Sequence, residues 1–145
     1  MKNTLILTVV CLMLSSCGTT SLYYWGGNRN SATAYEHFAY KSYDKQTPES
    51  ICRLIGVYES MIRNPKGTRN MPPPGICAEY GYLLLQPDTA EKFAQYASFD
   101  EKGLFSTSDY ATLFRQRGAE MLEKEIEYYP EAATFVLPLI KRLTE

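Results

Sequence analysis

The chain has 145 residues, with 15 basic and 16 acidic side chains and a formal net charge of −1 at pH 7. That length suits one domain with a modest core. We do not expect two independent domains. Basic and acidic residues are interspersed and form no Lys/Arg cluster of the kind that binds nucleic-acid phosphates, so we do not expect nucleic acid as a partner.

Residues 1–16 have the pattern of a secretory signal peptide. Lys2 supplies the positive start, an apolar run covers 5–14, and Leu14-Ser15-Ser16-Cys17 closes the segment with small residues before a cysteine. The apolar run is too short to cross a bilayer as a mature helix, which needs about 20 residues. The Leu-Ser-Ser-Cys order resembles the bacterial lipobox, in which the cysteine thiol receives diacylglycerol. We therefore expect cleavage before Cys17 and lipidation of that residue; the alternative is an ordinary signal peptide with a chance cysteine.

The lipobox resemblance also implies where the mature protein resides. Each buried methylene contributes about 0.8 kcal/mol, so the two or three acyl chains that the resemblance implies hold the protein essentially permanently at a membrane. Gly18, and not an aspartate, follows the cysteine. In the sorting rule of similar lipoproteins this implies the outer membrane, on a face that the sequence leaves open. Apart from this covalent lipid on Cys17 we expect no cofactor.

The segment over 17–30 has no helical period and contains two adjacent glycines, which predicts an extended tether. Tyr23, Tyr24 and Trp25 lie within it as candidate partner-binding residues, because large aromatics dominate binding hot spots. Two other interpretations remain open. The three rings either pack back on the protein's own helices or rest among lipid headgroups.

Residues 31–145 are predicted to form one helical domain. Apolar residues recur at three-to-four-residue spacing over about 31–44, 48–63, 76–86, 89–97, 106–129 and 130–143. Local signals delimit these helices: Ser31 as a possible cap, Thr47-Pro48 at a helix start, a weak capping box of Ser106 and Asp109, and a kink expected at Pro138. Gly81, in the middle of the third helix, predicts a close helix contact. Since no segment alternates as a strand does, the predicted fold is all-α, built from antiparallel helix pairs.

Cys52 and Cys77 are the cysteines that remain after cleavage and lipidation. Export places them in an oxidising compartment, and two consecutive predicted helices carry them, which makes a disulfide plausible. The alternative is a pair of small buried hydrophobes that never bond. A bridge between them would be structural, because the chain lacks Cys-x-x-Cys redox spacing.

Two family resemblances follow from longer motifs. Tyr80-Gly81 with Leu84, followed by Ala90, Ala94 and Ala97, resembles a tetratricopeptide repeat and implies a short helical solenoid. The lipobox, Leu22 to Gly27, Pro73 to Leu84 and the stretch from Glu123 to Ala132 together resemble the bacterial lipoprotein family catalogued as domain of unknown function 4810. Its members are typically encoded beside a lipoprotein similar to the curli secretion pore, which implies such a protein as partner. The stretch from Ala97 to Gly118 is longer than the family's usual connection.

The residue types needed for catalysis do not form a recognisable set. His37 has no second histidine to complete a metal site or to serve a serine nucleophile. The remaining acidic candidates are better suited to a solvated helix face than to sugar chemistry; they are Glu120, Glu123, Glu125 and Glu127. We therefore expect no catalytic residue, no metal and no small-molecule substrate.

The expected function is that of a non-enzymatic lipoprotein which binds another envelope protein as a scaffold or assembly factor. The rival is a cell-wall glycan enzyme or its activator. A concave groove with two facing acids would favour the rival, whereas a tyrosine-lined groove without such a pair would favour binding.

Overall fold

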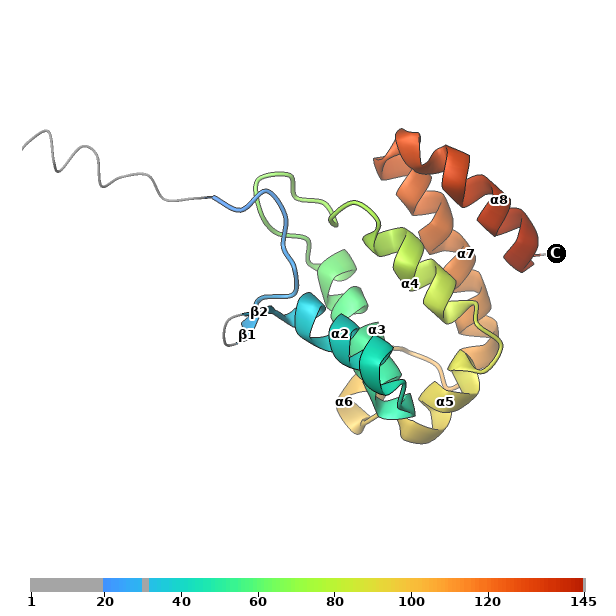
Figure 1. Cartoon of the computed structure of the whole chain (residues 1–145). Coiled ribbons are helices and arrows are strands. Elements are labelled where there is room, and N and C mark those ends of the chain that lie inside the picture. The colour runs from blue at the N-terminus through green and yellow to red at the C-terminus, as the bar shows by residue number, and fades with distance from the viewer. Residues whose placement is uncertain (1–19, 30–31, 145) are drawn as a thin grey trace, which may run out of the picture.

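The computed structural model describes residues 20–29 and 32–144. The predicted signal peptide over 1–16, the lipidation residue Cys17 and the possible cap Ser31 lie outside the described residues. Helices account for most of the described chain, and Figure 1 shows their arrangement. Their bounds are α2 Ala34–Lys45, α3 Pro48–Arg63, α4 Ile76–Leu84, α5 Thr89–Tyr96, α6 Phe99–Lys102, α7 Tyr110–Tyr128, η1 Pro130–Ala132 (a 3-10 turn) and α8 Ala133–Thr144.

The prediction of a mainly helical domain is confirmed, with one small addition. Two-residue strands, β1 Asn28–Arg29 and β2 Ala32–Thr33, pair antiparallel just before α2. Between the fourth and fifth predicted helices lies a further short helix, α6, which begins at a reciprocal capping box formed by Ser98 and Glu101. No helix among the described residues is long and apolar enough to span a membrane.

Local capping signals explain where the helices start. Thr33, together with Glu36, forms a capping box at the start of α2, and Thr47 caps α3 with Pro48 in its first turn, as predicted. At α7 the predicted box of Ser106 and Asp109 is wrong: Asp109 is itself the cap and accepts a hydrogen bond from the Thr112 amide. The helix therefore begins later than predicted. At the C-terminal end, α8 continues through Pro138.

The closest helix packing joins α4 to α7. The predicted close contact at Gly81 is confirmed, because a Cβ there would lie 2.7 Å from the carbonyl oxygen of Gly118 on α7. Ala94, which the repeat resemblance placed on a packing stripe of the next helix, is exposed on α5. A tetratricopeptide-like repeat therefore stays a prediction, since the intimate partner of α4 is not the helix that follows it.

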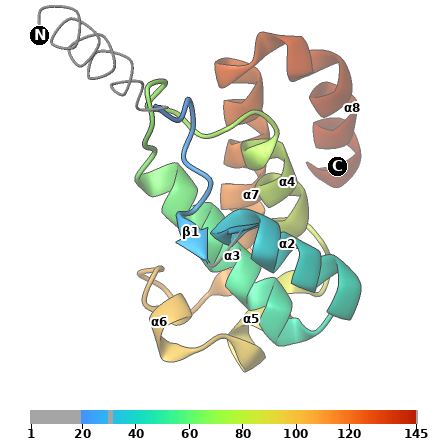
Figure 2. The same cartoon turned by 60° about the vertical axis from the view of Figure 1, so that its left-hand side comes forward.

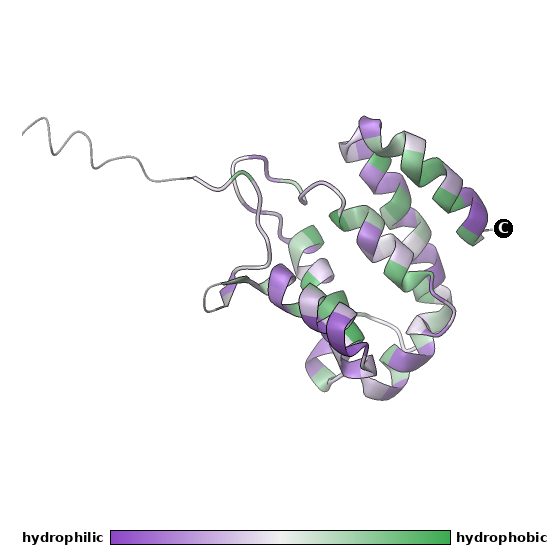
Figure 3. Ribbon diagram, viewed as in Figure 1, coloured by the Kyte–Doolittle hydropathy of each residue, from purple (hydrophilic) through white to green (hydrophobic). Residues whose placement is uncertain are grey.

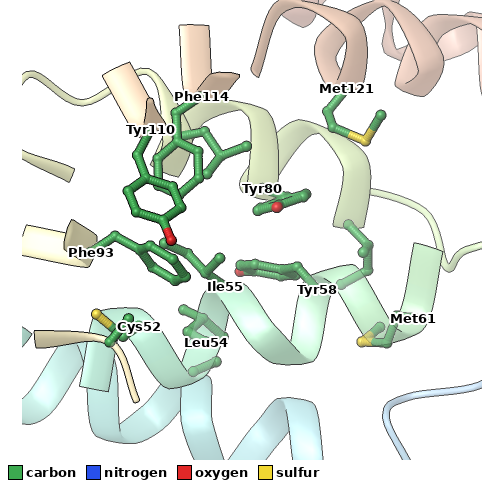
Figure 4. Close-up of a cluster of buried hydrophobic side chains, with 14 residues drawn as sticks. Cys52, Leu54, Ile55, Tyr58, Met61, Tyr80, Phe93, Tyr110, Phe114 and Met121 are labelled. Atoms are coloured by element: carbon green, nitrogen blue, oxygen red, sulfur yellow. The ribbon is translucent and has the colours of Figure 1, made fainter. Parts of the chain in front are cut away.

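The core lies where α3, α4, α5 and α7 meet, and Figure 3 shows apolar residues along several of these helices. Figure 4 shows Tyr58 and Tyr80 in the middle of this core, with an aromatic group formed by Phe93, Tyr110 and Phe114 on one side. The Phe93 ring packs edge-on to both Tyr110 and Phe114, at centroid distances of 5.0 and 5.2 Å. Such edge-to-face pairs add to the stability that burial provides.

The described part of the predicted tether is bound to the domain along its length. The Thr68 and Arg69 amides donate to the carbonyl oxygens of Ser21 and Leu22, both at 3.1 Å. Further along, the Tyr35 amide donates to the Trp25 carbonyl oxygen at 3.2 Å. Residues 20–29 are thus extended, but they are not a free tether, because their backbone groups find partners in the folded domain.

Candidate functional site

A tyrosine-lined groove runs between α2, α4 and α8, with a volume of about 300 Å³. We call it the tyrosine groove. Its rim carries two large, accessible rings: Tyr43 on α2 is 68% exposed and Tyr82 on α4 is 43% exposed. The full lining is Ser42, Tyr43, Leu54, Tyr58, Ala78, Glu79, Tyr82, Leu83 and Leu139.

The floor of the tyrosine groove is a carboxylate with two tyrosine partners. Tyr35 on α2 and Tyr58 on α3 both donate their hydroxyls to the same oxygen of Glu79, at 2.7 and 2.8 Å. Burial, the Glu79 charge and the hydrogen bond raise the pKa of the Tyr58 hydroxyl well above its usual range. The two hydroxyls therefore remain donors at neutral pH, and they tie α2 and α3 to α4 beneath the groove.

An aromatic ladder connects this floor to the N-terminal segment. The Trp25 ring lies 5.4 Å from the Tyr35 ring, Tyr35 lies 6.0 Å from Tyr58, and Tyr58 lies 5.4 Å from Tyr80. Trp25 and Tyr24 are partly buried against the core. Of the three interpretations of the aromatic segment, packing on the protein's own helices describes Trp25.

A second hollow, of about 590 Å³, holds a cluster of acidic and basic side chains; its walls include Phe105 and Leu113. Glu59 on α3 is fully buried and accepts hydrogen bonds from Tyr80 at 2.7 Å and from Arg63 at 2.5 Å. Arg117 on α7 adds two further contacts to Glu59, at 3.1 and 3.4 Å.

This cluster is saturated with hydrogen bonds and is therefore structural. Arg117 also contacts Glu120 at 3.1 Å, so the two acids facing the hollow share one guanidinium. Burial works to lower the Arg117 pKa, but the contacts with Glu59 and Glu120 outweigh it and raise that pKa. Because both oxygens of Glu59 are occupied by donors, neither is free to exchange a proton with a substrate.

Glu125 corrects a prediction made from the sequence. It was assigned with Glu120, Glu123 and Glu127 to a solvated helix face, but its side chain is buried on α7. Its two oxygens accept from the backbone amides of Gly75, at 2.7 Å, and Ala78, at 3.2 Å. A side chain from α7 thus caps the start of α4, whose own cap position is a glycine without a side-chain acceptor.

The sequence also failed to single out Glu59 and Glu79, although a signal for Glu59 was present. It lies four residues after the buried Ile55 and three before Ile62, on the apolar face of α3. A charge at such a position predicts a buried partner. Glu79 has no comparable signal, because its tyrosine partners lie 44 and 21 residues away.

The possible disulfide between Cys52 and Cys77 is absent. Both residues are free and buried, which is the alternative of two small hydrophobes. The Cys52 thiol donates to the carbonyl oxygen of Lys92 on α5, at 3.8 Å. Burial raises the pKa of both thiols to about 12, which keeps them protonated and unreactive at neutral pH.

His37 is half-buried on α2 and its ring packs edge-on to Phe38 at 5.0 Å. Within residues 20–29 and 32–144, no three histidine, cysteine or acidic side chains are grouped so that they could hold a metal ion. Comparison of the chain with protein families, with curated proteins and with solved structures finds no match. The resemblance to the lipoprotein family of unknown function accordingly remains a prediction.

Proposed function

We propose that the chain is a non-enzymatic lipoprotein, anchored at the outer membrane by lipid on Cys17, that binds another envelope protein as a scaffold or assembly factor. The partner that the sequence resemblance favours is a curli-pore-like lipoprotein. The observation that carries the binding role is the tyrosine groove, with two exposed rings on its rim and a predominantly apolar lining.

The chemistry of the groove suits a protein segment. Tyr43 and Tyr82 each present an apolar ring with a hydroxyl, which is the residue type that interface hot spots favour. Between them lie the apolar side chains of Leu54, Leu83 and Leu139. A partner side chain that enters the groove removes these surfaces from water and finds tyrosine hydroxyls at the rim for its polar groups.

The acidic groups near the hollows weigh against the glycan-enzyme alternative. Sugar hydrolysis needs two carboxyl groups that face each other across the substrate, one of them free to donate a proton. The tyrosine groove has one carboxylate in its lining, Glu79, and two hydroxyls already bind it. In the larger hollow, Glu59 and Glu120 are joined through Arg117.

Affinity purification with groove variants tests the binding role. The full-length lipoprotein with a C-terminal tag is crosslinked in cells, extracted from membranes in detergent, and its bound proteins are quantified. We expect Tyr43→Ser combined with Tyr82→Ser to reduce recovery of an envelope partner about tenfold or more, as the loss of hot-spot rings does. Both rings are exposed, so the variant should retain its fold, which thermal unfolding verifies.

Tyr96→Ser is the matched control. Tyr96 is 41% exposed, close to the value for Tyr82, but it lies on α5 outside the groove. Recovery that is equal for the groove variant, the control and the unmodified protein would reject the groove as the binding site. If no envelope protein is recovered at all, the scaffold role itself fails.

The anchor has its own test. We expect Cys17→Ser to abolish lipid attachment and to release the protein from the membrane fraction, because the acyl chains supply the membrane affinity. Intact-mass measurement of the unmodified protein should show an acylated first residue at Cys17. An unacylated mature chain would disprove the anchoring.

A further inference from the structure

We propose that the surface formed by Leu22, Tyr23, Tyr24, Lys66 and Arg69, named here the basic face, lies on anionic phospholipid headgroups and sets the orientation of the domain on the membrane. This inference rests on the proposed lipid attachment at Cys17. It goes beyond anchoring, because a lipid chain alone leaves the domain free to rotate above the bilayer.

Two stretches of the sequence without acidic residues supply the basic face. The first acidic residue of the chain is Glu36, so none lies between the predicted lipid and α2. The second stretch separates Glu59 from Glu79 and contains Arg63, Lys66 and Arg69. In a chain of net charge −1, these stretches carry only positive charge.

The fold brings the two stretches together. The amides of Thr68 and Arg69 donate to the carbonyl oxygens of Ser21 and Leu22, so the chain enters the domain alongside the basic loop. Gly67 makes this pairing possible: its φ is +92°, and a Cβ there would lie 2.7 Å from the Leu22 carbonyl oxygen. A side chain at 67 would separate the loop from the N-terminal segment.

Chain length fixes how far this face can be from the lipid. Thr20 follows Cys17 by three residues, and three extended residues span at most about 10 Å. That distance is comparable to the screening length of about 8 Å at physiological salt, and the loop that carries Lys66 and Arg69 is hydrogen-bonded to the next two residues after Thr20. If Cys17 carries lipid, the basic face is the part of the described chain that the linkage holds closest to the headgroups.

The side chains of the basic face suit an interface between water and lipid. A hollow of about 290 Å³ lies there, lined by Tyr23, Tyr24, Trp25 and Lys66 among others, with no acidic residue in its lining. The Lys66 ammonium lies 5.0 Å from the centroid of the Tyr24 ring. Tyrosine and tryptophan concentrate at the level of headgroups in membrane proteins, and basic side chains are attracted to anionic lipid.

The apolar and basic side chains of the basic face are accessible to solvent. Leu22 is 58% exposed, and Lys66 and Arg69 are exposed and form no ion pair with another described residue. Figures 1 and 2, which differ by a turn about the vertical axis, both show the start of the described N-terminal segment beside the loop that joins α3 to α4.

Amine labelling of the reconstituted lipoprotein tests the proposal. The full mature protein is inserted through its own lipid into vesicles of phosphatidylcholine, with or without phosphatidylglycerol. The rate of modification at each lysine is then followed by peptide mass spectrometry. We expect Lys66 to react about fivefold more slowly when phosphatidylglycerol is present, and high salt to remove the difference. Lys41 on α2 should react at the same rate in both vesicles.

Arg69→Glu provides the second arm. It leaves Lys66 in place but reverses the neighbouring charge, so we expect it to abolish most of the slowing. Arg115→Glu, at an exposed position on α7, is the matched control and should leave the slowing intact. Thermal unfolding checks that both variants are folded.

Equal labelling of Lys66 in the two kinds of vesicle, or equal slowing in both variants, would overturn the basic face as a lipid-binding surface. Failure of the proposed lipid attachment at Cys17 would give a different result. In that case the protein would not float with vesicles of either composition.

Discussion

Gly81 on α4 and Gly118 on α7 pack against each other so closely that neither position has room for a side chain. A Cβ at 81 would lie 2.7 Å from the Gly118 carbonyl oxygen, and a Cβ at 118 would lie 2.6 Å from Leu85 Cγ. The obstructing atom at 81 belongs to the backbone, which cannot rotate away. This contact holds α4 over the middle of α7 and so positions the wall of the tyrosine groove that α4 supplies.

Gly81→Ala should therefore destabilise the fold. Alanine inside a helix is intrinsically more favourable than glycine by about 1 kcal/mol, but forcing the two helices apart costs about 1–3 kcal/mol and more than cancels that gain. Gly56→Ala on α3 is the control, because its Cβ would make ordinary contacts at 3.7 Å or more. Urea denaturation should show a lower free energy of unfolding for Gly81→Ala and a slightly higher one for Gly56→Ala; the reverse order would refute the close contact.

Glu125→Ala should weaken the start of α4. The change leaves the partly buried amides of Gly75 and Ala78 without their carboxylate acceptor, which costs about 1–3 kcal/mol. Glu123→Ala, at an exposed position two residues earlier on α7, should change the free energy of unfolding by less than about 0.5 kcal/mol. Chemical denaturation of both variants measures the difference, and equal stabilities would show that the cap contributes nothing.

Glu59→Gln should be more damaging than Glu120→Gln. The fully buried Glu59 is the shared acceptor for Arg63, Arg117 and Tyr80. Its neutralisation leaves positive charge unpaired, at a cost of about 2–4 kcal/mol once the partial exposure of the arginines is allowed for. Glu120 is half exposed, so its loss should cost less than about 1 kcal/mol. Thermal denaturation ranks the two variants, and a Glu59→Gln variant as stable as the unmodified protein would exclude a structural role.

Cys52 and Cys77 should behave as protected thiols whose titration destabilises the fold in alkali. Their pKa values rise from 9.0 to about 12, so the folded state favours the neutral thiol. The stability that follows is complete below pH 9 and is lost as the pH rises from 9 toward 12. Urea denaturation at a series of pH values should show this decline, and an unchanged stability up to pH 11 would contradict it.

Alkylation followed by mass measurement tests the same thiols independently. At pH 8 the native protein should take up no reagent at these two positions, and in urea without reductant it should take up reagent at both. Absence of labelling in urea would reveal the disulfide that the structure lacks.

Much of the local structure could be predicted from the sequence because its signals lie within a few residues of one another. The Thr47-Pro48 start of α3 acts on the backbone of its own first turn, and the apolar period of α7 recurs from one turn of the helix to the next. The predicted signal peptide and lipid site at Cys17 are likewise read from one short segment, although they lie outside the described residues.

The candidate site depended on contacts between distant residues. Glu79 accepts a hydrogen bond from Tyr35, which lies 44 residues away in the sequence, and Glu125 accepts one from Gly75, which lies 50 residues away. Local sequence patterns do not predict such long-range contacts. For that reason Glu125 was assigned to the solvated face of its helix.

The sequence by itself thus determined that the chain is helical, where most helices begin and end, and which residue carries the expected lipid. Only the tertiary structure decided which helices touch, that Trp25 packs on Tyr35, that Cys52 and Cys77 are free thiols, and that the loop carrying Lys66 and Arg69 lies beside the N-terminal segment. The physical reason is range: propensity, capping and amphipathic period act within a turn or two of helix, whereas burial of a charge or a ring depends on the packing of the whole domain.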